Sequence, residues 1–225
     1  MLGRTAPLHV FAPGDYSELF AKELEFFCNR IEYDVVFHSI DTSVSCVIYE
    51  DRSMTVSTIP LNHKIPCCGF LFNEKPSLPH IRRDMIDMYG IPISQINNIK
   101  NGIDWTTPDG EVIPASRLTT AADAPRSYAY CSDTRYKPEL AEMLKGVNTL
   151  YHEATYADID QLRAEKYFHS TASEAATIAK AAGVGQLIIG HYSQRYNNEE
   201  TLLSEAKKVF PNTVLATENA QFNIF

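Results

Sequence analysis

Two imidazoles and one carboxylate of this sequence each follow directly on an apolar or alternating run. His63 ends TVSTIPLNH, Asp133 ends SYAYCSD and His191 ends QLIIGH. Side chains at the carboxyl ends of strands converge on the crevice where α/β folds place their sites. Two histidines and a carboxylate suit zinc, and a carboxylate can bridge two cations. Strand-end Asp and His are also common loop residues, so the layout alone leaves a metal site and plain loops open.

A second group lies between these positions, in YHEATY (151–156) and FHST (168–171). A carboxylate such as Glu153 within reach of an imidazole such as His169 fixes its tautomer and raises its pKa, so the pair could donate a proton or stabilise an anionic phosphate. A helix N-terminus there, with the hydroxyls of Ser170 and Thr171, would add donors for a phosphate. Helix capping by Thr171 accounts for the same residues without any catalytic or binding role, and both interpretations stay open.

Alternating strands and helices must position these residues in the second half of the chain. Strand-like runs at 127–133, 147–154, 184–191 and 213–218 alternate with helical runs at 137–146, 170–183 and 199–210. This spacing predicts an α/β layer sandwich. Thr171 and Glu174 fit a capping box, and a stripe of alanines predicts a helix packed close to the sheet; these are Ala172, Ala175, Ala176, Ala179 and Ala182.

The first half begins with a strand at 8–12 and a helix at 15–31, and then changes to a period of two. The runs at 33–40, 44–50, 53–61 and 69–72 read as consecutive strands. Residues 73–118 differ, because five prolines interrupt short helical pieces. They could form an arm that contacts a large partner through Arg82, Arg83 and Lys100, or an ordinary insertion with a solvated face.

Composition limits the class of protein. A chain of 225 residues with 44% hydrophobic residues suits one globular domain. The stretch at the N-terminus lacks the regions of a signal peptide and no run is long enough to cross a bilayer, which predicts a cytoplasmic protein without a membrane partner. Five cysteines without paired-knuckle spacing predict reduced thiols. The formal charge of -8 argues against a general nucleic-acid binder, so an RNA partner would need a local basic patch.

The combination of motifs resembles the ribonuclease Z family of tRNA 3′-processing endonucleases. PLNHKIPCCGF, YCSDT, YHEATY, HST and GHYSQRY occur in the family's order and at similar separations over nearly the whole chain. The resemblance implies an α/β fold, the metallo-β-lactamase αββα sandwich, and a zinc-dependent endoribonuclease that removes the 3′ trailer of precursor tRNA to leave a 3′-hydroxyl. It implies two zinc ions per complete active site, with His63 and His191 as terminal ligands and Asp133 as the bridge.

The same resemblance implies roles for further residues. Glu153 and His169 would be catalytic, protonating the leaving group or stabilising the transition state. The substrate would contact residues beside the site and on the arm, namely Ser193, Arg195, Tyr196, Arg82, Arg83 and Lys100. The family works as a homodimer in which one subunit's arm serves the other's site, and residues 73–118 occupy the arm's place although they lack its Gly-Pro element.

One departure is large: no segment of this sequence matches the family's upstream HxHxDH cluster. The chain, residues 1–225, therefore resembles the carboxyl-terminal part of one metallo-β-lactamase domain, and we expect it to be poorly active alone. Two alternatives stay open. One is another phosphodiesterase of the same fold, and the other is a non-catalytic module for tRNA binding or dimerisation.

Overall fold

The structure, a computed structural model, describes residues 4–14, 16–28 and 31–224. The chain divides into two compact units. The first comprises Met1–Glu50, Thr55–Phe72 and Ser127–Phe225, and the second comprises Asp51–Met54 and Asn73–Arg126. Among the described residues, no helix is long and apolar enough to cross a membrane.

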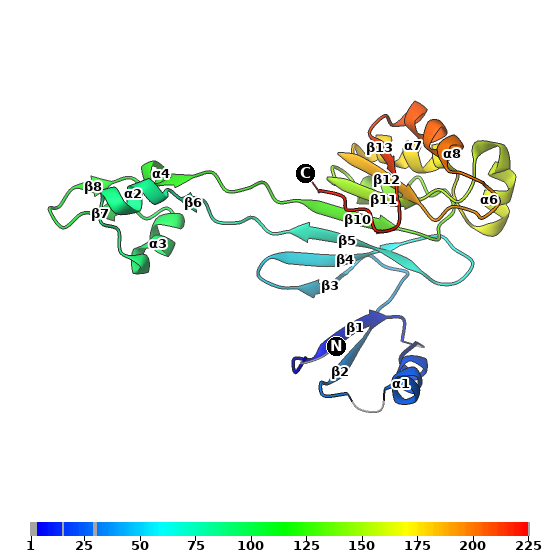
Figure 1. The fold of residues 1–225 in the computed structure, drawn as a ribbon, viewed down its shortest axis with the longest axis horizontal. Helices are drawn as coiled ribbons and strands as arrows, with labels where there is room; N and C mark the ends of the chain where they lie inside the picture. The colour runs from blue at the N-terminus through cyan, green and yellow to red at the C-terminus, as the bar shows by residue number, and fades with distance from the viewer. Residues whose placement is uncertain (1–3, 15, 29–30, 225) are drawn as a thin grey trace. The chain divides into compact units, whose positions relative to one another are not determined.

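Seven of the described strands form one sheet in the order β13-β12-β11-β10-β5-β4-β3 (Figure 1). The strands from β10 to β13 are mutually parallel, so their carboxyl ends share one edge, whereas β3 and β4 pair antiparallel. Valine, isoleucine and aromatic residues dominate these segments, as expected for strands with one or both faces covered. The strands are β3 (Val47–Glu50), β4 (Met54–Pro60), β5 (Cys68–Glu74), β10 (Ser127–Cys131), β11 (Thr149–Glu153), β12 (Gln186–Gly190) and β13 (Thr213–Leu215).

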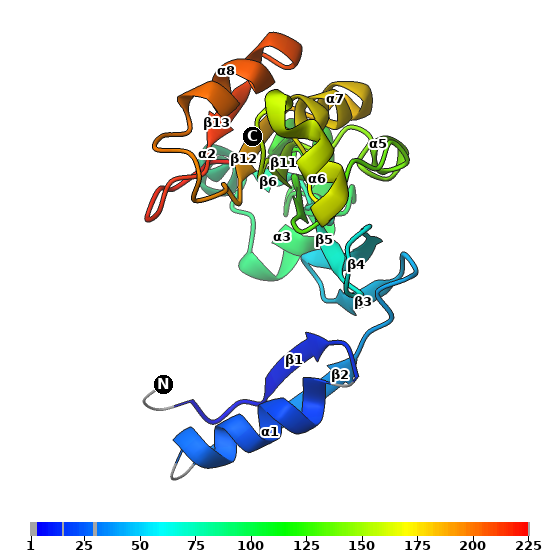
Figure 2. The same ribbon diagram turned by 90° about the vertical axis from the view of Figure 1, so that its right-hand side faces the viewer.

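Helices cover one face of the parallel strands, as Figures 1 and 2 show. Helix α7 packs on β11 and β12 and lies between α5 and α8, and α8 also contacts β13. These helices are α5 (Leu140–Met143), α7 (Ala172–Ala182) and α8 (Glu200–Val209). Between β11 and α7 the chain also forms a short 3-10 turn, η1 (Asp158–Asp160), and the largely exposed helix α6 (Gln161–Tyr167).

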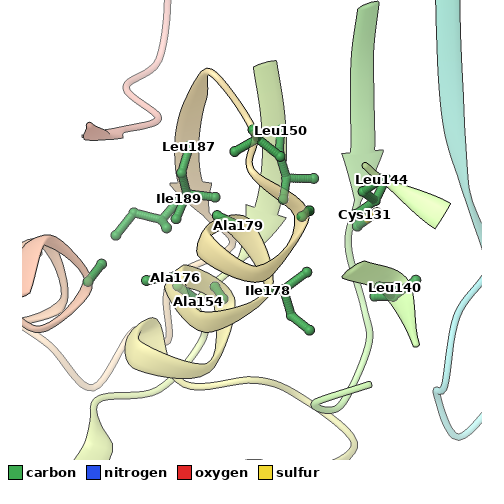
Figure 3. Packing of buried hydrophobic residues seen from close by; sticks show 14 of the residues in the cluster. Cys131, Leu140, Leu144, Leu150, Ala154, Ala176, Ile178, Ala179, Leu187 and Ile189 are labelled. Atoms are coloured by element: carbon green, nitrogen blue, oxygen red, sulfur yellow. The ribbon is translucent and has the colours of Figure 1, made fainter. Parts of the chain in front are cut away.

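The core under α7 confirms two sequence predictions. The capping box is present, with Thr171 accepting from the Glu174 backbone N–H and the Glu174 carboxylate accepting from that of Thr171. The alanine stripe is buried, and Figure 3 shows Ala176 and Ala179 facing the strand residues Leu187 and Ile189. Small side chains let the helix approach the sheet closely, and a bridge between Tyr156 and Thr171 places the start of the helix beside the segment that follows β11.

The amino-terminal part of the first unit is a parallel pair of strands with one helix. β1 (Leu8–Ala12) pairs with β2 (Val35–Ser39), and α1 (Tyr16–Phe27) connects them. None of the described residues from 4 to 39 is buried, and Phe26 and Phe27 are 81% and 78% exposed. The expected helix at 15–31 is shorter than predicted at its described end, while residues 15, 29 and 30 lie outside the described residues.

The second unit has its own small core. Its elements are β6 (His80–Ile81), α2 (Arg83–Met88), α3 (Ile93–Lys100), β7 (Trp105–Thr106), β8 (Val112–Ile113), α4 (Ala115–Leu118) and β9 (Thr119–Thr120). Five buried residues form the core: Ile91, Ile99, Ile113, Ala115 and Leu118. The expected insertion, residues 73–118, falls within this unit, and its role as an arm stays a prediction.

Candidate functional site

Five side chains from the carboxyl edge of the sheet and the loops beside it gather in one cluster. Donor atoms of His63, Asp133 and His169 lie within 4.8 Å of one another, and so do those of Glu153, His169 and His191. His191 Nε2 lies 3.4 Å from Asp133 Oδ1. The ring of His169 lies between the other two imidazoles, with centroid distances of 5.2 Å to His63 and 5.3 Å to His191. The structure thus brings together all the predicted ligands and both predicted catalytic residues.

Backbone geometry at the strand ends places two of these side chains. Asp133 follows β10 with φ +58° and His191 follows β12 with φ +62°. A left-handed backbone in a non-glycine residue is uncommon, costs ~1–3 kcal/mol and occurs preferentially at functional sites. Gly190 precedes His191 and packs directly against Tyr151. A Cβ at position 190 would overlap the tyrosine hydroxyl and ring, so the close approach requires glycine.

Glu153 is a fully buried carboxylate at the end of β11. Its Oε1 accepts from the Thr134 N–H at 2.6 Å and from His169 Nδ1 at 2.9 Å. Its Oε2 accepts from the Thr155 hydroxyl at 2.6 Å and from the Ser170 N–H at 3.1 Å. Burial alone would raise the pKa of Glu153, but hydrogen bonds from His169 and Thr155, the His169 charge and the Ser170 N–H together hold it below its usual value. The group is a charged anchor whose oxygens are already occupied, so it is a poor metal ligand.

The Glu153 carboxylate shifts the pKa of His169 and fixes which ring nitrogen is hydrogen-bonded. The hydrogen bond to Glu153 raises the pKa of His169, burial opposes this, and the charges of Glu153 and Asp133 add to the rise. Since Nδ1 donates to Glu153, Nε2 is the nitrogen left for other partners. A neutral ring could bind a cation through Nε2, whereas a protonated ring could only donate its proton there.

His63 and His191 both have Nδ1 engaged by the protein. His63 Nδ1 lies 3.0 Å from the Phe168 carbonyl, which can only accept, so Nδ1 carries the hydrogen and Nε2 keeps its lone pair. His191 Nδ1 lies 2.8 Å from Thr155 Oγ1. The side chains of His191 and Asp133 remain 41% and 43% exposed, which leaves this side of the cluster open to solvent.

Residues 191–196 are hydrogen-bonded to the segment that follows β11. The Ser193 N–H donates to the Thr155 carbonyl at 3.1 Å, and the Tyr196 hydroxyl donates to Asp160 Oδ2 at 2.8 Å. Arg195 Nη1 lies 3.2 Å from Asp160 Oδ1, and the guanidinium lies over the Tyr156 ring. Arg195 is therefore paired with a carboxylate within the protein, and its predicted contact with phosphate stays a prediction.

The predicted basic residues of the insertion belong to the second unit. Arg82 pairs with Asp84 at 2.8 Å and precedes α2, Arg83 begins α2, and Lys100 ends α3. Two of these three positions therefore lie at helix ends within that unit. Their contact with RNA stays a prediction.

Sequence reasoning missed Thr134 and Thr155, and it singled out Ser170 only as a donor for phosphate. All three residues supply donors to Glu153. A pocket of about 230 Å³ adjoins His169 and is lined by Arg135, Tyr136, Gln161, Glu165 and Glu174 besides His169 itself. Their positions in the sequence could have identified them, because each of the three donors lies within two residues of a predicted site residue. His152, by contrast, points into the core, since neighbouring strand residues face opposite sides.

Comparisons with known proteins show which proteins this chain is similar to. No family model matches the chain. Ribonuclease Z of Bacteroides fragilis strain YCH46 is 56% identical over 219 residues, which are 97% of this chain and 72% of that protein. Ribonuclease Z of Phocaeicola vulgatus is 51% identical over 224 residues, covering 100% of this chain and 72% of its own length.

Solved structures show what the fold is. The short form of human tRNase Z superposes with a TM-score of 0.61 at 18% identity, covering 97% of this chain and 68% of that one. YhfI from Bacillus subtilis, a metallo-β-lactamase fold protein, superposes with a TM-score of 0.57 at 15% identity, covering 93% of this chain and 61% of that one. The chain has the metallo-β-lactamase fold, and the predicted fold class is confirmed.

Proposed function

The chain belongs to the ribonuclease Z family, and from this premise we propose which of its side chains carry out the family's reaction. Membership makes it a hydrolytic endoribonuclease that processes the 3′ end of tRNA and depends on metal ions. The observation that carries our assignment is the cluster of His63, Asp133, His169 and His191 around the buried carboxylate of Glu153.

The donor set fits zinc. His63 and His191 both have Nδ1 engaged within the protein, so Nε2 is the nitrogen each presents, and Asp133 offers an exposed carboxylate. We propose that His63 and His191 would hold two different zinc ions, with Asp133 as a ligand common to both. Bound zinc supplies Lewis acidity and makes a coordinated water more acidic. Glu153 is excluded from the ligand set because its oxygens already accept four hydrogen bonds.

We assign the proton transfer to His169. Cleavage that leaves a 3′-hydroxyl breaks the bond between phosphorus and the 3′-oxygen, so the departing oxygen must gain a proton while water adds to phosphorus. The Glu153 carboxylate raises the pKa of His169 and holds Nδ1, so the proton for the 3′-oxygen resides on Nε2. Donating it leaves a neutral ring that is still hydrogen-bonded to Glu153.

Substrate contacts are proposed on two surfaces. Ser193, Arg195 and Tyr196 lie next to His191 in sequence and would face the phosphates near the cut. Arg82, Arg83 and Lys100 would bind the tRNA body from the second unit, supplying local positive charge in a chain whose formal charge is -8. A homodimer, with the second unit of one subunit serving the other's site, and a cytoplasmic location remain parts of the proposal.

The test pairs a metal count with RNA cleavage. Elemental analysis of dialysed protein gives zinc per chain, and precursor tRNA labelled at its 5′ end reports a product of mature length with a 3′-hydroxyl. We expect Asp133→Asn and His191→Ala to reduce both bound zinc and cleavage. Thr177→Val, a change on the exposed face of α7, is the control that should alter neither.

The same assay separates the alternatives. Preferential turnover of a small phosphodiester over precursor tRNA would favour another phosphodiesterase of this fold. Tight RNA binding without cleavage in excess zinc would favour a non-catalytic module and would contradict the proposed assignment.

A further inference from the structure

Thr155 is a buried hydroxyl at the centre of the cluster, and it is the only side chain described here that contacts Glu153, His191 and His169 at once. Its Oγ1 lies 2.6 Å from Glu153 Oε2, 2.8 Å from His191 Nδ1, 2.9 Å from the His191 carbonyl and 3.5 Å from His169 Nδ1. The side chain is almost fully inaccessible to solvent, so water cannot substitute for these partners. A hydroxyl has one hydrogen to donate, and the distances decide where it goes.

The hydrogen of Thr155 belongs to Glu153. An O–H···O⁻ bond to a carboxylate is typically 2.5–2.7 Å long and about twice as strong as a neutral bond, and the contact to Oε2 has this length. Directing the hydrogen to the His191 carbonyl instead would leave two unprotonated oxygens 2.6 Å apart at Glu153. Thr155 Oγ1 therefore presents a lone pair to His191 Nδ1.

A lone pair at 2.8 Å requires a hydrogen on the ring nitrogen that faces it. His191 Nδ1 must then carry a hydrogen, and in the neutral ring Nε2, which lies 3.4 Å from Asp133 Oδ1, carries the lone pair. We propose that Thr155 is a positioning residue that transmits the buried charge of Glu153 to His191 and so fixes the tautomer in which Nε2 can bind metal. The inference rests on the proposed metal site and adds how that site is prepared before metal arrives.

The chain of hydrogen bonds has one direction throughout. His191 Nδ1–H donates to Thr155, and Thr155 O–H donates to Glu153 Oε2, while His169 Nδ1–H donates to the same carboxylate from its other side. One buried charge thus orients the rings of two histidines, directly for His169 and through a hydroxyl for His191. Carboxylates that orient ligand histidines are worth 10–100-fold in metal affinity when they do so directly.

The test compares Thr155→Val, which keeps the shape and removes the hydroxyl, with Thr155→Ser, which keeps the hydroxyl. Long-range ¹H–¹⁵N NMR on metal-free protein reports the tautomer of His191, and competition with a chelator reports zinc affinity. We expect the wild type and Thr155→Ser to hold His191 with hydrogen on Nδ1. Thr155→Val should show a mixture of tautomers and bind zinc 10–100-fold more weakly. Thr177→Val, which loses a hydroxyl on exposed helix surface, should match the wild type.

The outcomes separate this inference from the proposed function. An unchanged His191 tautomer in Thr155→Val, with zinc affinity within threefold of wild type, would overturn the inference even if the wild type cleaves precursor tRNA. Absence of zinc binding in the wild type would overturn the proposed metal site, while the tautomer in metal-free protein would still decide the role of Thr155. If Thr155→Val does not fold, Thr155→Ala and Thr155→Ser carry the same comparison, with thermal unfolding as the check.

Discussion

Replacing Glu153 by glutamine changes one oxygen of the buried anchor into an NH₂ group and removes its charge. The amide oxygen fits best at the Oε1 position, where it keeps the Thr134 N–H and His169 Nδ1 as donors. The NH₂ group then lies at the Oε2 position, where the Thr155 hydroxyl can turn to accept but the Ser170 N–H cannot.

The magnitude follows from these contacts. The Ser170 N–H, left without an acceptor, lowers the free energy of unfolding by ~1–3 kcal/mol. The two hydrogen bonds at the Oε1 position no longer have a charged acceptor, which lowers it by ~1 kcal/mol each. The sum, ~3–5 kcal/mol, equals the range measured when one partner of a buried ion pair is removed. Urea unfolding of metal-free protein at pH 5.5 measures it. Glu165→Gln is the matched control, since Glu165 pairs with Arg135 at 2.8 Å but is 63% exposed, and its loss should cost no more than ~1 kcal/mol.

The pH dependence gives a second readout. The folded-state pKa of Glu153 lies below its ordinary 4.5, so its stabilisation is present above pH 4.5 and is lost as pH falls through the lowered value. The folded-state pKa of His169 lies above its ordinary 6.5, so its stabilisation is present below pH 6.5 and is lost as pH rises through the raised value. The pair therefore stabilises the fold most between pH 4.5 and 6.5. In Glu153→Gln the free energy of unfolding should fall less steeply both below and above this range. A variant within 1 kcal/mol of wild type, or one with unchanged flanks, would refute this account of the site.

Three further changes test other parts of the structure. Thr171→Ala removes the capping box of α7 and should lower the free energy of unfolding by ~0.5–2 kcal/mol, while Thr171→Ser should restore most of it; equal urea midpoints for all three proteins would contradict the assignment. Gly190→Ala forces a Cβ against Tyr151 and should cost ~1–3 kcal/mol in thermal unfolding, and a neutral result would mean that the strand end can shift freely. Arg195→Ala should raise KM for precursor tRNA about tenfold with little change in unfolding, because its pair with Asp160 is partly exposed; an unchanged KM would make Arg195 an anchor only.

The site was predictable where its residues follow strands. His63, Asp133 and His191 each end an apolar run. The parallel strands β10 and β12 bring Asp133 and His191 to one edge of the sheet, so the convergence of these two follows from the pattern, whereas His63 follows β4, which pairs antiparallel with β3. The α7 helix was equally readable, since its capping box and alanine stripe are local features. For these elements local propensity and tertiary packing favour the same structure.

Other parts left no such pattern in the sequence. α6 was not predicted because its larger apolar side chains do not face a core. Ala164 is buried, but Leu162 is 84% exposed, and Ile159 just before the helix is 93% exposed. The short strands of the second unit have only two residues each, too few for a period to be visible. Thr155 could not be ranked above any other threonine, because its role depends on which groups lie within 3 Å of it in space.

The end of α6 gives two of the histidines a common reference point. Phe168 caps the helix in a left-handed conformation, its carbonyl accepts from His63 Nδ1, and the next residue along the chain is His169. Any thermal displacement of the helix end therefore carries His169 with it covalently and draws the His63 ring in the same direction through the hydrogen bond. The separation between the two rings is thus buffered against movement of the helix end, so the spacing between a proposed metal ligand and the proposed proton donor can persist while their surroundings move.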